Sequence, residues 1–173
     1  MNVLSETVIR GMSPSDLEDV LALERLVFPT PWTREIFEYE IRHKERALFL
    51  VAEVKGRIEG YMGAHMLGDE VHLTNMAVAP GFRRRGLGTA MFLECLNRGI
   101  ESGARWVTLE VRDGNDGARE FYRNFGFRDM GLRKGYYSDT GEDAVIMASR
   151  DLQGAYFREL LSTVKAALDR KAG

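Results

Sequence analysis

Cysteine is almost absent from this sequence, with one in 173 residues. A single cysteine excludes an internal disulfide framework and favours a reducing compartment. The chain also lacks an apolar run long enough to cross a bilayer. Its first residues, Met1 to Glu6, lack a basic segment followed by an apolar core. We therefore expect no signal peptide, no membrane partner and a cytoplasmic location.

Strong positive charge is missing as well. The formal net charge of −2 at pH 7 argues against a surface that coats nucleic acid, so we expect no nucleic-acid partner. The three histidines, His43, His65 and His72, have no metal-ligand spacing, and we expect no metal. Cys95 lies among apolar positions of an expected helix, where a small buried hydrophobe is a better interpretation than a nucleophile.

The composition that is present, 45% hydrophobic and 29% charged residues, is typical of a soluble globular protein with one core. Alternating and helical spacings predict one α/β domain over residues 1–150, whose mixed, mainly antiparallel central sheet is flanked by helices. The expected strands are 7–10, 47–54, 58–66, 70–78, 105–112, 127–137 and 144–148. Helices are expected after Ser13, after Thr33 or Thr30, after Gly86 and after Asp116.

Residues 151–173 predict an amphipathic helical extension at the C-terminus. Leu152, Tyr156, Leu160 and Val164 recur every four residues, so their apolar stripe must be buried. Two accounts stay open, because the stripe can pack back on the domain or form a homodimer contact.

The segment from Asn75 to Ala90 follows an expected strand and opens an expected helix. A helix start has unpaired N–H groups and partial positive charge, which suit an anion. Gly86 and Gly88 let the backbone approach a phosphate closely, and Arg83 to Arg85 add positive charge. The sequence therefore predicts a pyrophosphate site, and the alternative is a basic turn before an ordinary helix. A nucleotide-binding Gly-Lys-Ser/Thr loop and the three-glycine dinucleotide pattern are both absent.

Glu110 is a carboxylate in an otherwise apolar expected strand. Desolvation raises the pKa of an unpaired buried carboxylate, which makes Glu110 a candidate general base. The alternative is a glutamate at a frayed strand end, paired with Arg112.

Tyr122 belongs to the helix after that strand, and its phenol could protonate a leaving group. The alternative is a core aromatic beside Phe121 and Phe125. Asn115 suits a helix cap, and the pair Tyr136–Tyr137 is either ordinary for a strand end or a clamp for a peptide.

Several of these motifs together resemble the Gcn5-related N-acetyltransferase (GNAT) family. Arg83-x-x-Gly86-x-Gly88 directly after Met76-Ala77-Val78 is similar to the acetyl-CoA motif of that family. The resemblance spans residues 7–149 and is closest to the bacterial ribosomal-protein alanine N-acetyltransferases (RimI-type). It is carried further by Glu110-Val111-Arg112, Asn115, Phe121 to Phe127, Tyr136-Tyr137 and Glu142 to Met147, and by Phe28-Pro29 with Pro31-Trp32.

This resemblance implies a direct transfer of acetyl from acetyl-CoA to the N-terminal amine of a ribosomal protein. It implies Glu110 as proton acceptor and Tyr122 as proton donor to the CoA thiolate. Phe28, Trp32, Tyr136 and Tyr137 would hold the acceptor. The implied acetyl-CoA contacts are Met76, Ala77, Val78, Arg84, Arg85, Gly86, Leu87, Gly88, Thr89 and Asn115. The alternatives are a lysine, polyamine or antibiotic acceptor, or an acyl-CoA-binding module without catalysis.

Overall fold

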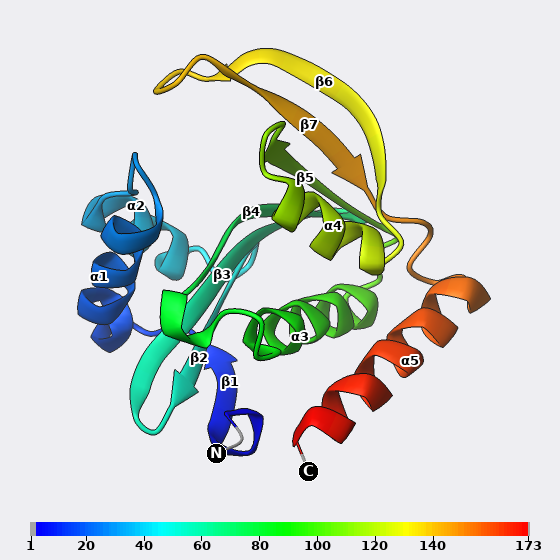
Figure 1. Ribbon diagram of the computed structural model, residues 1–173, viewed down its shortest axis with the longest axis horizontal. Coiled ribbons are helices and arrows are strands. Elements are labelled where there is room, and N and C mark those ends of the chain that lie inside the picture. Colours follow the sequence, from blue (N-terminus) through cyan, green and yellow to red (C-terminus); the bar gives the residue numbers. More distant parts are fainter. Residues whose placement is uncertain (1–2, 173) are drawn as a thin grey trace.

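One seven-stranded sheet runs through the chain in the order β1-β2-β3-β4-β5-β7-β6. The computed structural model describes residues 3–172 (Figure 1). Strands β4 and β5 pair in parallel and the other neighbours pair antiparallel, which confirms the mixed, mainly antiparallel sheet. The strands are β1 (Thr7–Gly11), β2 (Ala47–Val54), β3 (Arg57–Leu67), β4 (Glu70–Val78), β5 (Trp106–Arg112), β6 (Arg128–Tyr137) and β7 (Glu142–Ala148).

Helices lie on both faces of this sheet (Figure 1). Helices α1 (Leu17–Val27) and α2 (Arg34–Arg42) share a smaller core with β2 and β3. The larger core contains residues of α3 (Leu87–Glu101), α4 (Asp116–Asn124) and α5 (Ala155–Ala172). Short 3-10 turns, Leu4–Glu6, Pro14–Asp16 and Pro80–Phe82, precede β1, α1 and α3. None of the helices within residues 3–172 is both long and apolar enough to span a bilayer.

Alternation along the strands separates the two cores. In β2, Leu50 and Ala52 belong to the larger core, whereas Phe49 and Val51 belong to the smaller one, because successive side chains point to opposite faces. The smaller core extends only as far as Ala77 of β4. Beyond it, the same face of the sheet carries Thr108, Glu110 and Arg112 of β5.

A β-bulge in β4 decides the geometry of the middle of the sheet. Gly63 pairs with Asn75 and Ala64 pairs with Leu73, so Thr74 is an extra residue in β4. A bulge reverses the faces of the side chains that follow it and bends the strand. A β-carbon on Gly63 would lie 2.4 Å from Cε1 of Phe49 and 2.9 Å from Oγ1 of Thr74. Only glycine therefore fits opposite the bulge.

The C-terminal helix packs on its own domain. Phe157 and Leu161 are buried in the larger core, and Leu168 packs against it. The helix begins at Ala155 rather than directly after residue 150, because Asp151 Oδ1 first accepts the N–H of Gln153 in a turn (3.1 Å). Of the predicted stripe, Leu152 is buried and Leu160 and Val164 are partly buried, whereas Tyr156 is exposed. The helix thus packs on its own domain mainly through Phe157 and Leu161, and a homodimer contact through it stays a prediction.

Candidate active site

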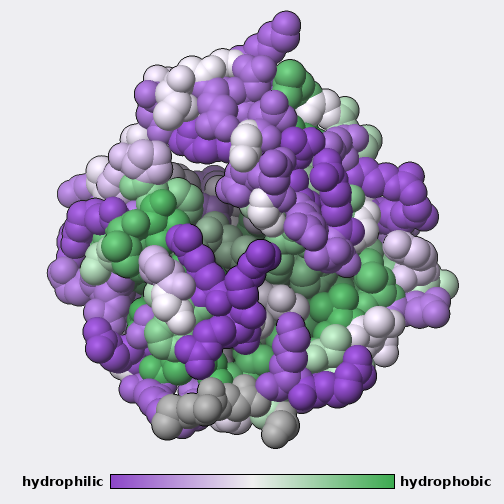
Figure 2. Space-filling view, in the orientation of Figure 1, coloured by the Kyte–Doolittle hydropathy of each residue, from purple (hydrophilic) through white to green (hydrophobic). Residues whose placement is uncertain are grey.

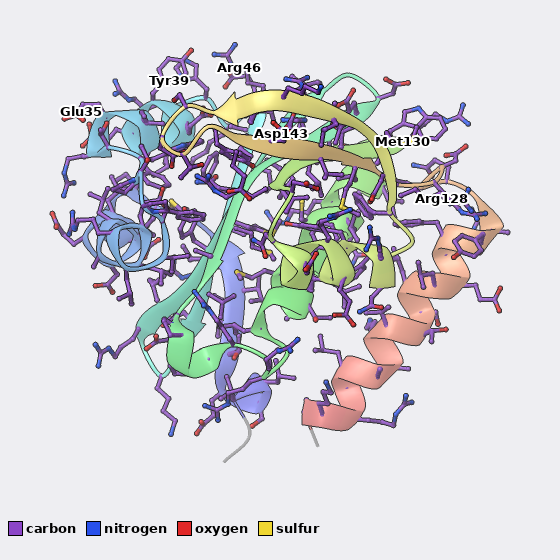
Figure 3. The ribbon with its side chains drawn as sticks, turned by 45° about the horizontal axis from the view of Figure 1, so that its top comes forward. Glu35, Tyr39, Arg46, Arg128, Met130 and Asp143 are labelled. Atoms are coloured by element: carbon purple, nitrogen blue, oxygen red, sulfur yellow. The ribbon has the colours of Figure 1, made fainter. Side chains whose placement is uncertain are left out.

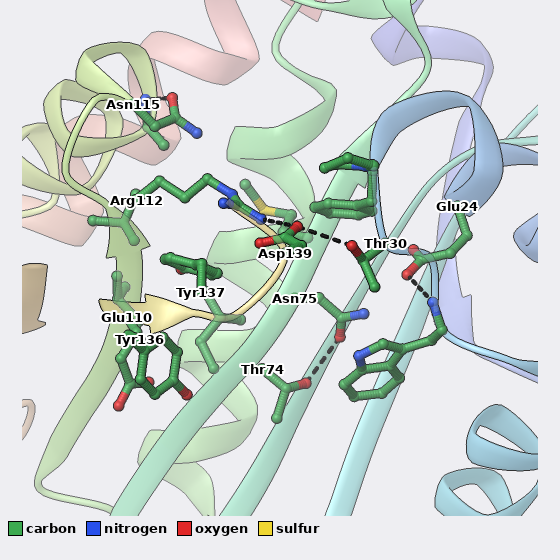
Figure 4. Close-up of a pocket in the computed structure, with 18 of the residues that line it drawn as sticks. Glu24, Thr30, Thr74, Asn75, Glu110, Arg112, Asn115, Tyr136, Tyr137 and Asp139 are labelled. Carbon is green, nitrogen blue, oxygen red and sulfur yellow. Dashed lines mark hydrogen bonds and ion pairs between the residues drawn. The ribbon is translucent and has the colours of Figure 1, made fainter. Parts of the chain in front are cut away.

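Strands β4 and β5 separate in the middle of the sheet. They are paired only from Glu70–Trp106 to Leu73–Leu109, and the bulge at Thr74 begins at the next residue of β4. A cavity of about 360 Å³ lies there (Figure 4). It is lined by residues of α1, β4, β5, α4, the α1–α2 loop and the β6–β7 hairpin. In Figure 2 the surface is hollowed below that hairpin, which lies at the top of the view.

The cavity brings together many side chains that the sequence singled out. Those that line it are Phe28, Trp32, Met76, Glu110, Asn115, Tyr122, Tyr136 and Tyr137. The remaining predicted residues, Ala77, Val78 and Arg84 to Thr89, are not part of its lining. Ala77 is buried in the smaller core, because the bulge has turned its side chain toward α1. Val78 is the last residue of β4, and Arg84 to Thr89 form the turn before α3 and its first residues.

Glu110 lies on the polar face of β5, with its side chain only 10% exposed. Its Oε2 is 3.1 Å from His72 Nε2 and its Oε1 is 3.5 Å from a guanidinium nitrogen of Arg133. The other ring nitrogen of His72 lies 2.8 Å from Thr108 Oγ1. Glu110 is therefore buried with partners, and the interpretation as an ion pair with Arg112 is wrong: that arginine pairs with acidic side chains of the β6–β7 hairpin.

Tyr122 lies on the opposite face, in the larger core. Its ring packs against Phe92, at 5.5 Å between centroids, and Phe127, at 5.8 Å. Burial raises the pKa of the Tyr122 phenol well above its ordinary value. The phenol thus keeps its proton at neutral pH and lines the cavity from the side of α3 and α4. Cys95 is buried in the same core, and burial raises the pKa of its thiol to about 12, which fits a core residue rather than a nucleophile.

The start of α3 lies beside the end of β4. A β-carbon on Gly88 would lie 3.7 Å from Met76 Cε and 3.7 Å from Val78 Cγ2. Gly86 caps the helix in the left-handed region with φ of 92°, and Arg84 is left-handed as well, with φ of 63°. The first N–H groups of a helix have no partner within it, so this turn offers backbone donors next to exposed arginines.

The free edge of β4 also faces the opening between the strands. The N–H of Ala79 donates to the Glu59 carbonyl (2.8 Å), toward β3. Peptide groups alternate in direction along a strand, so the N–H groups of Met76 and Val78 point away from β3. In agreement, the Val78 carbonyl accepts from Arg83 Nε (3.2 Å). Backbone donors of β4 therefore face the gap that β5 leaves.

A bridge of side chains closes one side of the cavity. Figures 1 and 3 both show the β6–β7 hairpin reaching over the sheet toward α2. Oδ2 of Asp139 at its tip accepts from Thr30 Oγ1 (2.9 Å) and from Arg112 (2.8 Å). The Arg112 guanidinium lies 3.9 Å from the centroid of the Tyr137 ring. These contacts hold the hairpin against the α1–α2 loop (Figure 4).

Sequence reasoning missed two side chains of this region. Glu24 is 1% exposed and lines the cavity; its signal was an acidic residue in the apolar spacing of α1. His72 was dismissed for lack of metal-ligand spacing, yet it contacts Glu110. No local pattern indicated this contact, because it depends on the parallel pairing of β4 with β5. Among residues 3–172, no group of three or more His, Cys, Asp or Glu side chains could hold a metal ion.

Comparisons with known proteins show the family of the chain. Residues 17–127 match the Acetyltransferase (GNAT) family. A Bacillus subtilis protein, provisionally named a ribosomal protein bS18-alanine N-acetyltransferase, is 36% identical over 143 residues, 83% of this chain and 95% of its own length. The ribosomal protein bS18-alanine N-acetyltransferase of Escherichia coli K12 is 30% identical over 142 residues, 81% of this chain and 95% of its own length.

Solved structures give the same result. The crystal structure of the ribosomal-protein-S18-alanine N-acetyltransferase from Escherichia coli has a TM-score of 0.78 and 28% identity, covering 86% of this chain and 96% of that one. Arabidopsis thaliana Naa50, solved with the bisubstrate analogue CoA-Ac-MVNAL, shares the fold with a TM-score of 0.74 at 17% identity, over 83% of this chain and 98% of that one. The chain belongs to the GNAT family of acetyltransferases.

Proposed function

We propose that this chain transfers the acetyl group of acetyl-CoA to the N-terminal α-amine of a protein, and that its acceptor is the N-terminal alanine of a small-subunit ribosomal protein. The observation that carries the proposal is the opening between β4 and β5. Glu110 approaches it from one face of the sheet, and Tyr122 with the start of α3 approaches it from the other. Two substrates can thus meet there from opposite faces. The names of the relatives support the choice of acceptor.

The α3 side suits acetyl-CoA as the acetyl donor. Backbone N–H groups from Arg84 to Thr89 would hold the pyrophosphate, and Gly88 leaves room for its approach. The N–H groups of Met76 and Val78, which point away from β3, would bind the thioester carbonyl. The Asn115 side chain, which lines the cavity, would contact the cofactor. Ala77 would contribute only its backbone, because its side chain faces the smaller core.

The opposite side suits an extended peptide end. Phe28 and Trp32 from the α1–α2 loop face Tyr136 and Tyr137 from the hairpin across the cavity. Aromatic side chains with the carboxylates of Glu24, Glu110 and Asp139 in the same cavity suit the cationic amine of an extended peptide. The bridge between Thr30 and Asp139 would exclude a folded segment from this side.

The chemistry would need one base and one acid. Glu110 takes a proton from the α-ammonium, whose pKa is about 8, and passes it toward solvent through His72. The amine nitrogen then forms a bond to the thioester carbon, while the N–H of Met76 or Val78 binds the oxyanion, a contact worth about 3–4 kcal/mol in comparable sites. The C–S bond breaks, Tyr122 protonates the departing thiolate, and the second proton of the nitrogen restores the phenol. One proton is released overall, and no acyl-enzyme forms.

Release of CoA with a panel of acceptors tests the proposal. The panel holds a peptide that begins with alanine and continues with basic residues, the same peptide with a blocked N-terminus, a peptide whose only free amine is a lysine, and spermidine. We expect turnover with the unblocked alanine peptide alone. Turnover with lysine or spermidine but not with that peptide would contradict the proposed acceptor. Tight acetyl-CoA binding without turnover on any amine would contradict catalysis.

A further inference from the structure

Glu24 is a buried carboxylate that the proposed chemistry does not use. It lies in the last turns of α1, is 1% exposed, and lines the cavity. Burying an ionised carboxylate costs several kcal/mol unless donors satisfy it. Both of its oxygens have such donors: Oε1 accepts the N–H of Trp32 (2.9 Å), and Oε2 accepts the hydroxyl of Tyr61. Burying this carboxylate lowers the stability of the fold unless its hydrogen bonds offset the cost, which suggests a functional reason for its position beside the cavity.

The hydrogen bonds beyond Tyr61 all run in one direction. Thr74 Oγ1 donates to Asn75 Oδ1 (2.9 Å), and Asn75 Nδ2 donates to the Tyr61 oxygen (2.9 Å). Tyr61 in turn donates to Glu24. A carboxylate only accepts hydrogen bonds, so the charge of Glu24 orients every donor in this series of hydrogen bonds. Neighbouring hydrogen bonds in such a series strengthen one another.

The two ends of this hydrogen-bond network lie on opposite sides of the cavity, in β4 and in the α1–α2 loop. One end is the extra residue of the β4 bulge, directly before Asn75 and Met76. The other end is the backbone of Trp32, in the loop that also carries Phe28. Glu24 therefore connects the α1–α2 loop, here called the acceptor loop, to β4, whose N–H groups face the opening (Figure 4). Burial raises the pKa of Glu24, whereas its two donors oppose that shift.

We propose that Glu24 is a positioning residue, which through Trp32 and through Tyr61–Asn75 holds the acceptor loop and the β4 backbone at Met76 in one fixed relation. In this role Glu24 acts through its hydrogen bonds to Trp32 and Tyr61 rather than on a reacting atom. This inference rests on the proposed function, because the fixed relation is the one between the acceptor amine and the thioester carbonyl. Displacement of reacting groups by about 1 Å can reduce a rate about a hundred-fold.

Three substitutions separate the two connections. Glu24→Gln keeps the shape but removes the charge and replaces one accepting oxygen with a donating NH2 group, so one connection is lost and the other weakens. Tyr61→Phe removes only the connection to β4. Glu40→Gln is the matched control, because Glu40 is a partly buried carboxylate that bonds to His65 (2.9 Å) and is not part of the cavity lining.

The expected kinetic results differ between these variants. For Glu24→Gln we expect kcat to fall about ten-fold or more and the KM of the peptide to rise several-fold. For Tyr61→Phe we expect a lower kcat with an unchanged KM, and the double variant should match Glu24→Gln. Glu40→Gln should stay within two-fold of the parent, and the Kd of acetyl-CoA should stay within two-fold in all of them.

A fluorescence measurement tests the contact without any turnover. The chain has two tryptophans, so a Trp106→Phe background leaves Trp32 as the only reporter on the loop. Acrylamide should quench Trp32 more strongly after Glu24→Gln and to the parental extent after Glu40→Gln. If the parent acetylates no amine, the proposed function fails, while this comparison still decides the contact.

Two results would overturn the positioning role. One is a folded Glu24→Gln variant, with native circular dichroism, whose kcat, KM and Trp32 quenching all stay within two-fold of the parent. The other is a loss of activity in proportion to the unfolded fraction alone, which would leave only a structural role. If Glu24→Gln does not fold, Tyr61→Phe decides, and parental kcat in that variant contradicts the proposal.

Discussion

A substitution at Leu168 of α5 tests whether the C-terminal helix stabilises the turn before α3. A β-carbon on Gly86 would lie 3.0 Å from Leu168 Cδ1, so this leucine packs directly against the backbone of the turn that opens α3. Replacing it with alanine removes that support without touching the cavity. We expect the turn to loosen and its backbone donors to lose their fixed arrangement.

The magnitude follows from burial. Leu168 is partly buried, and full burial of a methylene is worth about 0.8 kcal/mol, so Leu168→Ala should cost about 1 kcal/mol. If that cost falls on the turn, the Kd of acetyl-CoA rises about five-fold, because 1.4 kcal/mol corresponds to ten-fold. The kcat at saturating substrates should not change, since neither Glu110 nor Tyr122 is moved.

Isothermal titration with acetyl-CoA measures this effect. Leu160→Ala is the matched control on the same helix, because Leu160 packs against Gly126, where a β-carbon would lie 3.1 Å from its Cδ2. Leu160→Ala should lower stability but leave the Kd unchanged. An unchanged Kd in Leu168→Ala, or an equal rise in both variants, would refute a specific support of the turn by α5.

Three further predictions concern single side chains. Tyr122→Phe keeps the ring in its core position, and we expect kcat to fall about a hundred-fold or more with an unchanged Kd for acetyl-CoA; parental kcat would exclude the acid role. His72→Gln should lower kcat/KM about ten-fold through loss of the contact to Glu110, whereas His65→Gln should not, and peptide turnover across pH 6–9 compares them. The hydrogen bond from Arg10 lowers the pKa of Asp16 from 3.8 to about 2, so its ionised form stabilises the fold by about 2 kcal/mol above pH 4, and this is lost as the pH falls through 2. Urea unfolding of Asp16→Asn should show that deficit at pH 7 and a shrinking one below pH 3.

Local patterns were enough to predict most elements of the fold. The strands Ala47–Val54 and Glu70–Val78 have the expected bounds, because alternation and turn residues are local signals. The expected helix after Gly86 is also confirmed: α3 begins at Leu87, and Gly86 caps it in a left-handed conformation.

The contacts that shape the cavity could not be predicted in this way. The bulge at Thr74 depends on the ring of Phe49 over Gly63, three segments that meet only in the folded sheet. Glu24 falls in the apolar spacing of α1, and nothing local reveals that it contacts a tyrosine 37 residues away. The bridge from Thr30 to Asp139 joins residues 109 apart. These are properties of tertiary packing rather than of spacing.

The role of Glu110 is the central chemical claim, and mass spectrometry of one peptide tests it most directly. The parent protein and Glu110→Gln are incubated with acetyl-CoA and the unblocked alanine peptide, and the acetylated atom is located by fragmentation. We expect the parent to acetylate the N-terminal amine. Glu110→Gln, which keeps the side-chain shape beside His72 and Arg133, should do so about a hundred-fold more slowly with the same Kd for acetyl-CoA. An N-terminal product formed at the parental rate by Glu110→Gln would contradict the account.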